Sequence, residues 1–131
     1  MRELKFRGWD KKRKRMFVAT TINASGSVSV FMDDGLYLLP AEQVELMQYT
    51  GLKDKNGKEI YVGDIVRAED DAHYLVGVVE WNEDYGKYEV IYNQISGNSF
   101  DFEGDNGYSV ANSCKVIGNI YEKPELLESK K

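Results

Sequence analysis

The chain has few residues with the chemistry of a catalytic nucleophile. It contains one histidine, His73, and one cysteine, Cys114, which lies between Ser113 and Lys115. Nucleophilic catalysis needs a nucleophile, a base and a group that orients the base, so a Cys–His pair is one hypothesis. A free cysteine, however, is more often packed as a small apolar side chain. We therefore expect His73 on the surface, Cys114 partly buried, and no catalytic residue.

Acidic residues cluster in one segment with partial likeness to a calcium-binding loop. The segment from Asp101 to Gly107 has carboxylates at the first, third and fifth positions of such a loop. The sixth position is Asn106 instead of glycine, and the twelfth is Asn112 instead of a bidentate glutamate. The acidic run Glu69–Asp71 has no metal-binding pattern either. We expect both segments to be solvated loops and expect no metal site.

Motifs for cofactors and for acid–base catalysis are also missing from the sequence. One histidine and one cysteine are too few ligands for a zinc site. The chain has no Walker sequence and no G-x-G-x-x-G loop between a strand and a helix. Acidic residues are plentiful, but no spacing singles out a pair of catalytic carboxylates. We expect no cofactor, and an enzyme with carboxylate chemistry is our last-ranked hypothesis for function.

The most prominent charge feature is a basic run near the N-terminus, Lys11, Lys12, Arg13, Lys14 and Arg15. The first 17 residues contain eight Lys or Arg and two Asp or Glu, a balance of +6, whereas the rest contains nine and twenty, a balance of −11. The run could bind nucleic-acid phosphates or an acidic partner, or form a solvated loop beside the chain's own acidic surface. Because the acidic body repels phosphate backbones, we expect no binding to duplex DNA.

Aromatic residues are the second feature that suggests an interaction surface. Tyrosine and tryptophan are frequent at interfaces because they combine apolar area with a polar tip. Trp9 lies just before the basic run, whereas Trp81 lies in a predicted strand, where we expect it to be in the core. The candidate interaction surface therefore consists of Trp9, Lys11, Lys12, Arg13, Lys14 and Arg15.

The elements that position these residues are predicted to be mostly β-strands. Apolar and polar residues alternate at Leu4–Trp9, Ser27–Phe31 and Lys87–Tyr92, as they do in half-buried strands. Asp10–Arg15 is predicted to be the loop of a hairpin, because a β-branched run follows it. Short helices are expected only near Pro40–Gln43 and at the C-terminus from Pro124 to Glu128, since proline is favoured at the first helical position.

Two turns in the middle of the chain are clearly signalled. The sequence Asp54-Lys55-Asn56-Gly57 predicts a tight hairpin turn, because Asn56 and Gly57 tolerate positive φ. We expect Gly57 to have positive φ. A second turn is predicted at Gly63 and Asp64, just before the β-branched run Ile65–Val66. These four turn residues are structural candidates and not binding residues.

The C-terminal half has the parts of a small barrel. From Glu59 to Tyr121 the sequence predicts a glycine–aspartate turn, a short strand, the long strand His73–Trp81, a hairpin and a closing strand, which is similar to Src-homology-3-like barrels. Gly77 in the long strand predicts a bulge or a close backbone approach. Residues 93–113 are predicted to be a long loop with one short strand near Phe100. The predicted fold class is thus a small β-barrel or sandwich built from hairpins, with this barrel in the C-terminal half and a short C-terminal helix.

Three stretches of the chain carry a resemblance to a known family. They are Arg2–Asp10, Glu45–Arg67 and Val116–Leu127, and in the first of them Gly8 stands where the family usually has a small residue. On these stretches the chain resembles the YopX family, small proteins encoded by phages and prophages. The resemblance implies no established activity.

The resemblance implies one domain, residues 1–131. Its possible subdivision is into N-terminal hairpins at 1–50, a small barrel at 51–128 and a frayed tail at 129–131. Residues 18–43 and 68–113 lie outside the resemblance, so a function specific to this chain is expected in those segments.

Composition points to a soluble protein. The chain is 42% hydrophobic but has no apolar run long enough to span a bilayer, no signal peptide and no second cysteine for a disulfide. We expect a cytoplasmic location, which for a phage product is the host cytoplasm. The preferred function is a non-enzymatic module that binds a host or phage protein, with self-association through exposed strand edges as a further option. The first alternative is weak nucleic-acid binding through Lys11–Arg15.

Overall fold

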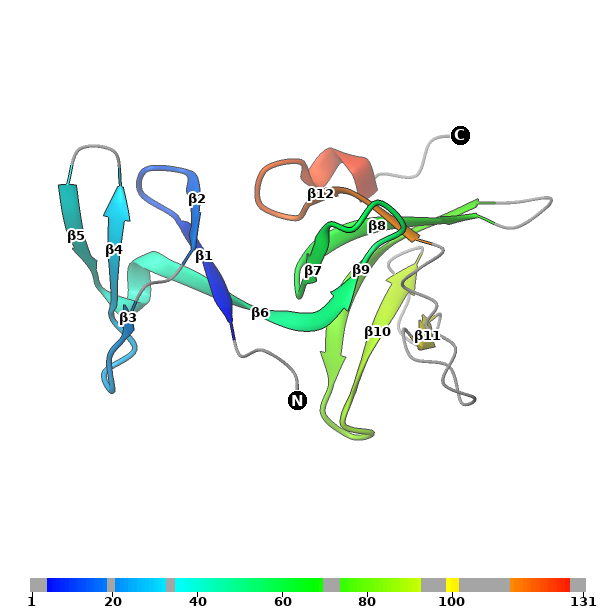
Figure 1. Ribbon diagram of the computed structural model, residues 1–131, viewed down its shortest axis with the longest axis horizontal. Helices are drawn as coiled ribbons and strands as arrows, with labels where there is room; N and C mark the ends of the chain where they lie inside the picture. The colour runs from blue at the N-terminus through cyan, green and yellow to red at the C-terminus, as the bar shows by residue number, and fades with distance from the viewer. Residues whose placement is uncertain are drawn as a thin grey trace. The chain divides into compact units, whose positions relative to one another are not determined.

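The computed structural model describes residues 5–18, 21–32, 35–69, 74–92, 99–101 and 114–127 (Figure 1). The chain folds into two compact units, Met1–Tyr49 and Thr50–Lys131, and each unit has a hydrophobic core of its own. His73, most of the calcium-like segment and the C-terminal tail lie outside the described residues, so the predictions about them stay predictions.

The described residues are mainly β, as predicted, and their helical turns are short. The strands of the first unit and the strand that leaves it are β1 (Phe6–Asp10), β2 (Arg15–Val18), β3 (Thr21–Ile22), β4 (Val28–Met32), β5 (Gly35–Leu39) and β6 (Val44–Lys53). The second unit continues with β7 (Glu59–Tyr61), β8 (Asp64–Glu69), β9 (Tyr74–Asn82), β10 (Lys87–Tyr92), β11 (Ser99–Asp101) and β12 (Cys114–Asn119).

Two 3-10 helices stand where helices were expected. η1 (Ala41–Gln43) follows Pro40, and η3 (Pro124–Leu127) follows the last strand. The predicted short C-terminal helix is therefore not confirmed beyond the single 3-10 turn of η3. No helix among the described residues is long and apolar enough to cross a membrane.

The first unit is built from two antiparallel sheets. β1 pairs with β2 on one side and with β6 on the other, and a separate three-stranded sheet has the order β3-β4-β5. Alternation along the strands directs every second side chain inward. The buried side chains that form this core are Phe17, Val28, Val30, Leu39 and Val44, with Tyr37 packed against them.

The small residue in the opening stretch has a packing explanation. Gly8 of β1 pairs with Phe17 of β2, and a Cβ atom added to Gly8 would lie 2.4 Å from the Phe17 ring. The aromatic ring thus covers the glycine backbone across the strand pair. A larger residue at this position would push Phe17 out of the core.

The second unit contains a five-stranded sheet with the order β11-β10-β9-β8-β12. Four consecutive strands form a meander, and β12 closes it by pairing with β8. The turn, strands and hairpin predicted between Glu59 and Tyr121 are present, and the curled sheet forms a half-barrel. The short strand expected near Phe100 is β11. The core of the unit consists of Ile60, Val66, Val79, Tyr88, Val90, Cys114 and Val116.

Two expectations about this unit are refined by the structure. Gly77 lies in regular register with its neighbours, and a Cβ there would lie 2.5 Å from the carbonyl oxygen of Ile91. Of the two options, a bulge or a close backbone approach, the glycine therefore serves the close approach. Cys114 is fully buried in the core instead of partly buried.

The prediction that Trp81 lies in the core is wrong. Its side chain is 46% exposed. The reason is strand register: β8 pairs with β9 only as far as Val78, so Trp81 lies where β9 extends beyond β8 and has only β10 beside it. There it pairs with Tyr88, and the two rings meet edge to face with centroids 4.8 Å apart.

The two signalled turns form as predicted. Gly57 has a φ of 83°, and its backbone N–H donates to the carbonyl of Asp54 at 3.0 Å. Asn56 does not have positive φ, since Lys14 is the one non-glycine residue with positive φ among the described residues. In this turn only the glycine therefore has that conformation. Gly63 has a φ of 92°, and Asp64 accepts a hydrogen bond from the backbone of Tyr61 at 2.8 Å.

Candidate functional site

The basic run forms the loop of the β1–β2 hairpin, and a buried aspartate organises it. Asp10, the last residue of β1, pairs with Arg15, the first residue of β2. Between them, the backbone N–H of Lys14 donates to the carbonyl of Asp10 at 2.7 Å. The Oδ1 atom of Asp10 accepts hydrogen bonds from the backbone N–H groups of Lys12 and Arg13, at 3.0 and 3.2 Å. This is the turn chemistry that aspartate side chains favour. The carboxylate therefore fixes the loop from inside.

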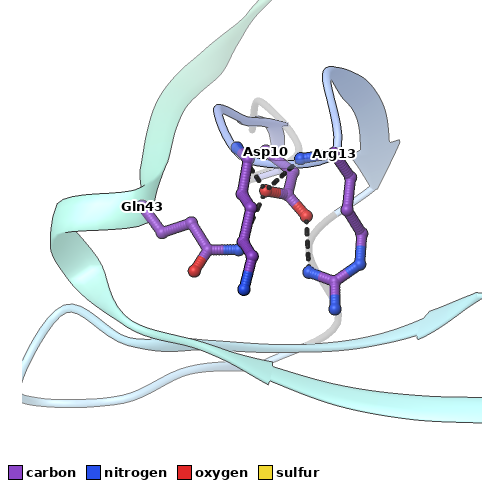
Figure 2. Close-up of polar contacts among 4 residues, drawn as sticks. Asp10, Arg13 and Gln43 are labelled. Atoms are coloured by element: carbon purple, nitrogen blue, oxygen red, sulfur yellow. Dashed lines mark hydrogen bonds and ion pairs between the residues drawn. The ribbon is translucent and has the colours of Figure 1, made fainter.

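Two side chains complete the surroundings of this carboxylate (Figure 2). Gln43 of η1 donates its Nε2–H to Oδ1 of Asp10 at 2.9 Å, and Arg13 Nη1 donates to Oδ2 at 3.1 Å. Burial raises the pKa of Asp10, but the hydrogen bonds from Gln43, Arg13 and Lys12 outweigh burial, so the pKa lies below its ordinary value. Asp10 is thus a buried anion at neutral pH.

Some of the basic side chains of the loop contact other residues of the protein, and the others do not. Lys11 Nζ lies 2.9 Å from Oε1 of Glu45 and donates to the carbonyl of Glu42 at 3.2 Å. The Arg13 guanidinium, besides bonding Asp10, lies 4.6 Å from the ring centroid of Tyr37 on β5. Two of the five cations are therefore held by the protein itself.

Three cations of the run remain for an external partner. Lys12, Lys14 and Arg15 are exposed, and their side chains make no ion pair or hydrogen bond within the described part of the chain. Trp9 is half-buried in β1 between β2 and β6, so it adds less surface than a fully exposed ring. The candidate surface expected from the sequence is thus reduced to three exposed charges and part of an indole.

A second surface of the same unit was missed by the sequence analysis. Phe31 on β4 and Leu36 and Leu38 on β5 are 70%, 62% and 68% exposed. Phe31 pairs with Leu36, and Leu38 is two residues further along β5, so the three side chains share one side of the β3-β4-β5 sheet. We call these three residues the apolar face. The only signal in the sequence was that apolar residues are adjacent, Val30 with Phe31 and then Leu36 to Leu39, and such runs do not tell which side is buried.

The side chains opposite the apolar face explain its exposure. Val28, Val30 and Leu39 alternate with the exposed residues along the same strands, and they are buried in the core of the first unit. Both sides of this sheet are therefore apolar, whereas a sheet with one solvated side usually has polar residues there. This makes the apolar face unusual for a surface that contacts only water.

One exposed aromatic residue also lies at the tip of the β9–β10 hairpin, in the second unit. Tyr85 is 75% exposed, and Lys87 Nζ lies 5.1 Å from its ring centroid. Glu83 and Asp84 in the same turn are exposed as well. The hairpin tip is mixed in charge and aromatic, as solvated turns commonly are, and it has no continuous apolar surface.

Nothing in the described residues assembles a metal centre. No group of three or more His, Cys, Asp or Glu side chains there could hold a metal ion. Cys114 is buried in the core of the second unit, while its proposed partner His73 lies outside the described residues. The candidate sites among the described residues are therefore the surfaces formed by the basic loop and by the apolar face.

Solved structures share this fold over nearly the whole chain. A protein from Enterococcus faecalis, EF1440, is 25% identical, with a TM-score of 0.59 over 98% of this chain and 100% of that one. Protein yopX from Bacillus subtilis is 23% identical, with a TM-score of 0.62 over 97% of this chain and 98% of that one. No curated protein matches the chain significantly.

The family to which these observations point covers both units. The sequence model of the family described as YopX protein matches residues 5–128. The match includes the basic loop, the apolar face and the two signalled turns. This chain belongs to the YopX family.

Proposed function

We propose that the protein is a non-enzymatic protein-binding module and that the apolar face is its binding surface. The observation that carries this proposal is the adjacency of three large exposed apolar side chains, Phe31, Leu36 and Leu38, on one side of a sheet. Single exposed apolar residues are normal, but contiguous ones mark interaction sites. Burying such side chains stabilises a complex by about 25 cal/mol for each Å² of apolar area removed from water.

The apolar face is held in place before a partner arrives. β4 and β5 pair through five residues on each strand, and the other side of their sheet packs on the buried core of the first unit. A rigid surface loses little conformational entropy when it binds, which favours affinity. This supports a preformed docking surface over one that folds on binding.

A second candidate function is weak binding of single-stranded nucleic acid by the basic loop. The specific observation in its favour is that Lys12, Lys14 and Arg15 are exposed and unengaged among the described residues. Three cations release few counterions, so the affinity gained from phosphate contacts is small at physiological salt. The net charge of −5 further opposes the approach of a polyanion.

Two further parts of the proposal come from the family and the composition. Membership of the YopX family suggests a phage or prophage protein. The single cysteine suits a reducing compartment such as the host cytoplasm. We propose this location together with a partner protein from the host or the phage.

The proposal is tested by capture from a lysate of the bacterial host with three tagged proteins. They are the wild type, a variant with Phe31→Ser, Leu36→Ser and Leu38→Ser, and the control Tyr85→Ser, which removes an equally exposed side chain from the second unit. We expect wild type and Tyr85→Ser to retain the same protein and the triple variant to lose it. Equal retention by all three, with all three folded by circular dichroism, would show that the apolar face does not bind.

A further inference from the structure

The turn that begins at Asp54 contains an asparagine followed by a glycine, Asn56-Gly57, and both residues are exposed. In such a pair the backbone nitrogen of the glycine can attack Cγ of the asparagine side chain, because glycine has no Cβ atom that keeps the two groups apart. Asparagine is accordingly one of the thermolabile residues of proteins. The turn therefore contains the groups for a spontaneous change of its own backbone.

The folded turn prevents these two groups from reacting. The N–H of Gly57 donates to the carbonyl of Asp54 at 3.0 Å, and neither Lys55 nor Asn56 has positive φ, so the turn is of type I. In a type I turn the second central residue, here Asn56, has a ψ of about 0°. Ring closure needs a different ψ, at which the Gly57 nitrogen faces the Asn56 side chain, and it needs the proton that the Asp54 carbonyl now accepts to leave. The reaction therefore requires local opening of the turn.

The Asp54 side chain keeps the turn closed. Its Oδ1 atom accepts hydrogen bonds from the backbone N–H groups of Asn56 and Lys58, at 2.8 and 2.9 Å. The N–H of Lys55 adds a bond to the carbonyl of Cys114 at 3.0 Å, which ties the turn to β12. Hydrogen bonds to a charged group contribute more to stability than bonds between neutral groups. The carboxylate is thus the main obstacle to opening the turn around Asn56.

We propose that Asn56 is a deamidation site that Asp54 protects in the folded chain. When the turn opens, hydroxide takes the proton of the Gly57 nitrogen, and this nitrogen forms a bond to Cγ of Asn56. The bond from Cγ to Nδ2 breaks, and Nδ2 takes a proton from water and leaves as ammonia. Water then opens the cyclic imide at either carbonyl and gives aspartate or isoaspartate, with no oxidation or reduction in either step.

The isoaspartate product changes the turn itself. Its backbone runs through Cβ and Cγ of residue 56, so one more carbon separates the residue from the Gly57 nitrogen. The hydrogen bond from Gly57 to the carbonyl of Asp54 then cannot form in its present geometry. The modification thus removes the turn that had prevented it, and it does so independently of the apolar face and of any partner.

Mass spectrometry of the purified full chain, incubated at neutral pH and then digested, measures the conversion of Asn56. We expect conversion in buffer to be about tenfold slower, or slower still, than in urea above the unfolding midpoint, because opening the turn breaks several hydrogen bonds. The second Asn-Gly pair of the sequence, Asn106-Gly107, is measured in the same urea sample and verifies that the chemistry proceeds there. Equal rates for Asn56 in buffer and in urea would overturn the inference.

Variants at Asp54 test whether its carboxylate is the protecting group. Asp54→Ala, folded by circular dichroism, should convert Asn56 in buffer about tenfold faster than the wild type does. The control Asp84→Ala removes an exposed aspartate from another turn and should leave the rate unchanged. Asp54→Ser keeps one oxygen acceptor and takes the place of the alanine variant if that variant is unfolded. A folded Asp54 variant with the wild-type rate would contradict the protecting role.

The effect of the extra backbone carbon is measured on the converted protein, which ion exchange separates by its added negative charge. The variant Asn56→Asp has the same charge and an ordinary backbone, so it is the matched control. We expect the isoaspartate form to unfold at a lower urea concentration than Asn56→Asp. Equal midpoints would show that the turn accommodates the longer backbone, against the inference.

Discussion

The Oδ2 atom of Asp54 lies 2.9 Å from the backbone nitrogen of Val116, 62 residues later in the chain. The other carboxylate oxygen, Oδ1, accepts hydrogen bonds from the backbone N–H groups of Asn56 and Lys58, at 2.8 and 2.9 Å. One buried aspartate therefore shapes the tight turn between β6 and β7 and ties it to the closing strand β12. This explains why an aspartate stands at the start of the signalled turn.

The first prediction concerns this carboxylate. In Asp54→Asn, Oδ1 can keep its two bonds, but the amide nitrogen would meet the N–H group of Val116, and two donors cannot bond each other. We expect the free energy of unfolding to fall by about 1–3 kcal/mol, the cost of an unsatisfied buried polar group. Urea unfolding beside Asp84→Asn, an exposed control, measures the difference. Equal midpoints for the two variants would show that the Val116 bond contributes nothing.

The second prediction concerns the pH dependence of stability, because the pKa values of both buried aspartates, Asp10 and Asp54, are shifted in the same direction. For Asp54, burial raises the pKa, but the N–H groups of Val116, Lys58 and Asn56 and the charge of Lys58 outweigh it, so its pKa, like that of Asp10, lies below 3.8. A pKa lowered on folding means that the unfolded chain binds protons first. The stability from both carboxylates is therefore complete above 3.8 and is lost as the pH falls below that value.

The measurement for this prediction is the free energy of unfolding between about pH 2 and about pH 6. The wild type should lose stability steeply in the acid range, and the variant with Asp10→Asn and Asp54→Asn should start lower and lose less. Parallel curves for wild type and variant would contradict the lowered pKa values.

The third prediction concerns Gly57. Its φ of 83° is strained for a β-branched residue, while no atom lies within 4 Å of a Cβ added there. Gly57→Val should therefore destabilise the protein by about 1 kcal/mol or more through backbone strain alone. Asn56→Val is the matched control, since Asn56 is exposed in the same turn without positive φ. Thermal unfolding should separate the two variants, and an equal loss in both would refute the backbone explanation.

The fourth prediction concerns nucleic acid. With Lys12, Lys14 and Arg15 unengaged, at most three phosphate contacts form, and the logarithmic salt slope for duplex DNA should not exceed about 2.7. We expect no significant binding of duplex DNA near physiological salt and at best weak binding of single strands. Titration of labelled oligonucleotides with wild type and with a variant that has serine at these three positions measures this. Submicromolar binding at physiological salt that the variant loses would make the basic loop the functional site.

The sequence was sufficient for the features that local chemistry determines. The Asp54–Gly57 turn, the glycine–aspartate turn at Gly63 and the succession of strands along the C-terminal half follow from turn residues and alternation, and the structure has them. The role of Asp10 was not predictable, because Gln43, which holds it, is 33 residues away in the sequence. The exposure of Trp81 depends on where β8 stops pairing, which composition does not encode.

The apolar face shows the same limit. Val30 and Phe31 are adjacent in β4 and both are apolar. Only the packing of the first unit decides that Val30 is buried and Phe31 is exposed. A strand that is apolar on both sides has no internal signal for its solvent side. Its exposure becomes visible only once the sheet is assembled, and so does the binding surface that we propose.

Site-specific photocrosslinking tests the central claim, protein binding through the apolar face, most directly. The photoreactive amino acid benzoylphenylalanine replaces Phe31, Leu38 or Tyr85, one at a time, and the tagged proteins are irradiated in host cells and analysed by mass. The account predicts covalent adducts with a protein from positions 31 and 38 and none from position 85, although all three side chains are exposed. Adducts from position 85 alone, or from no position, would contradict it.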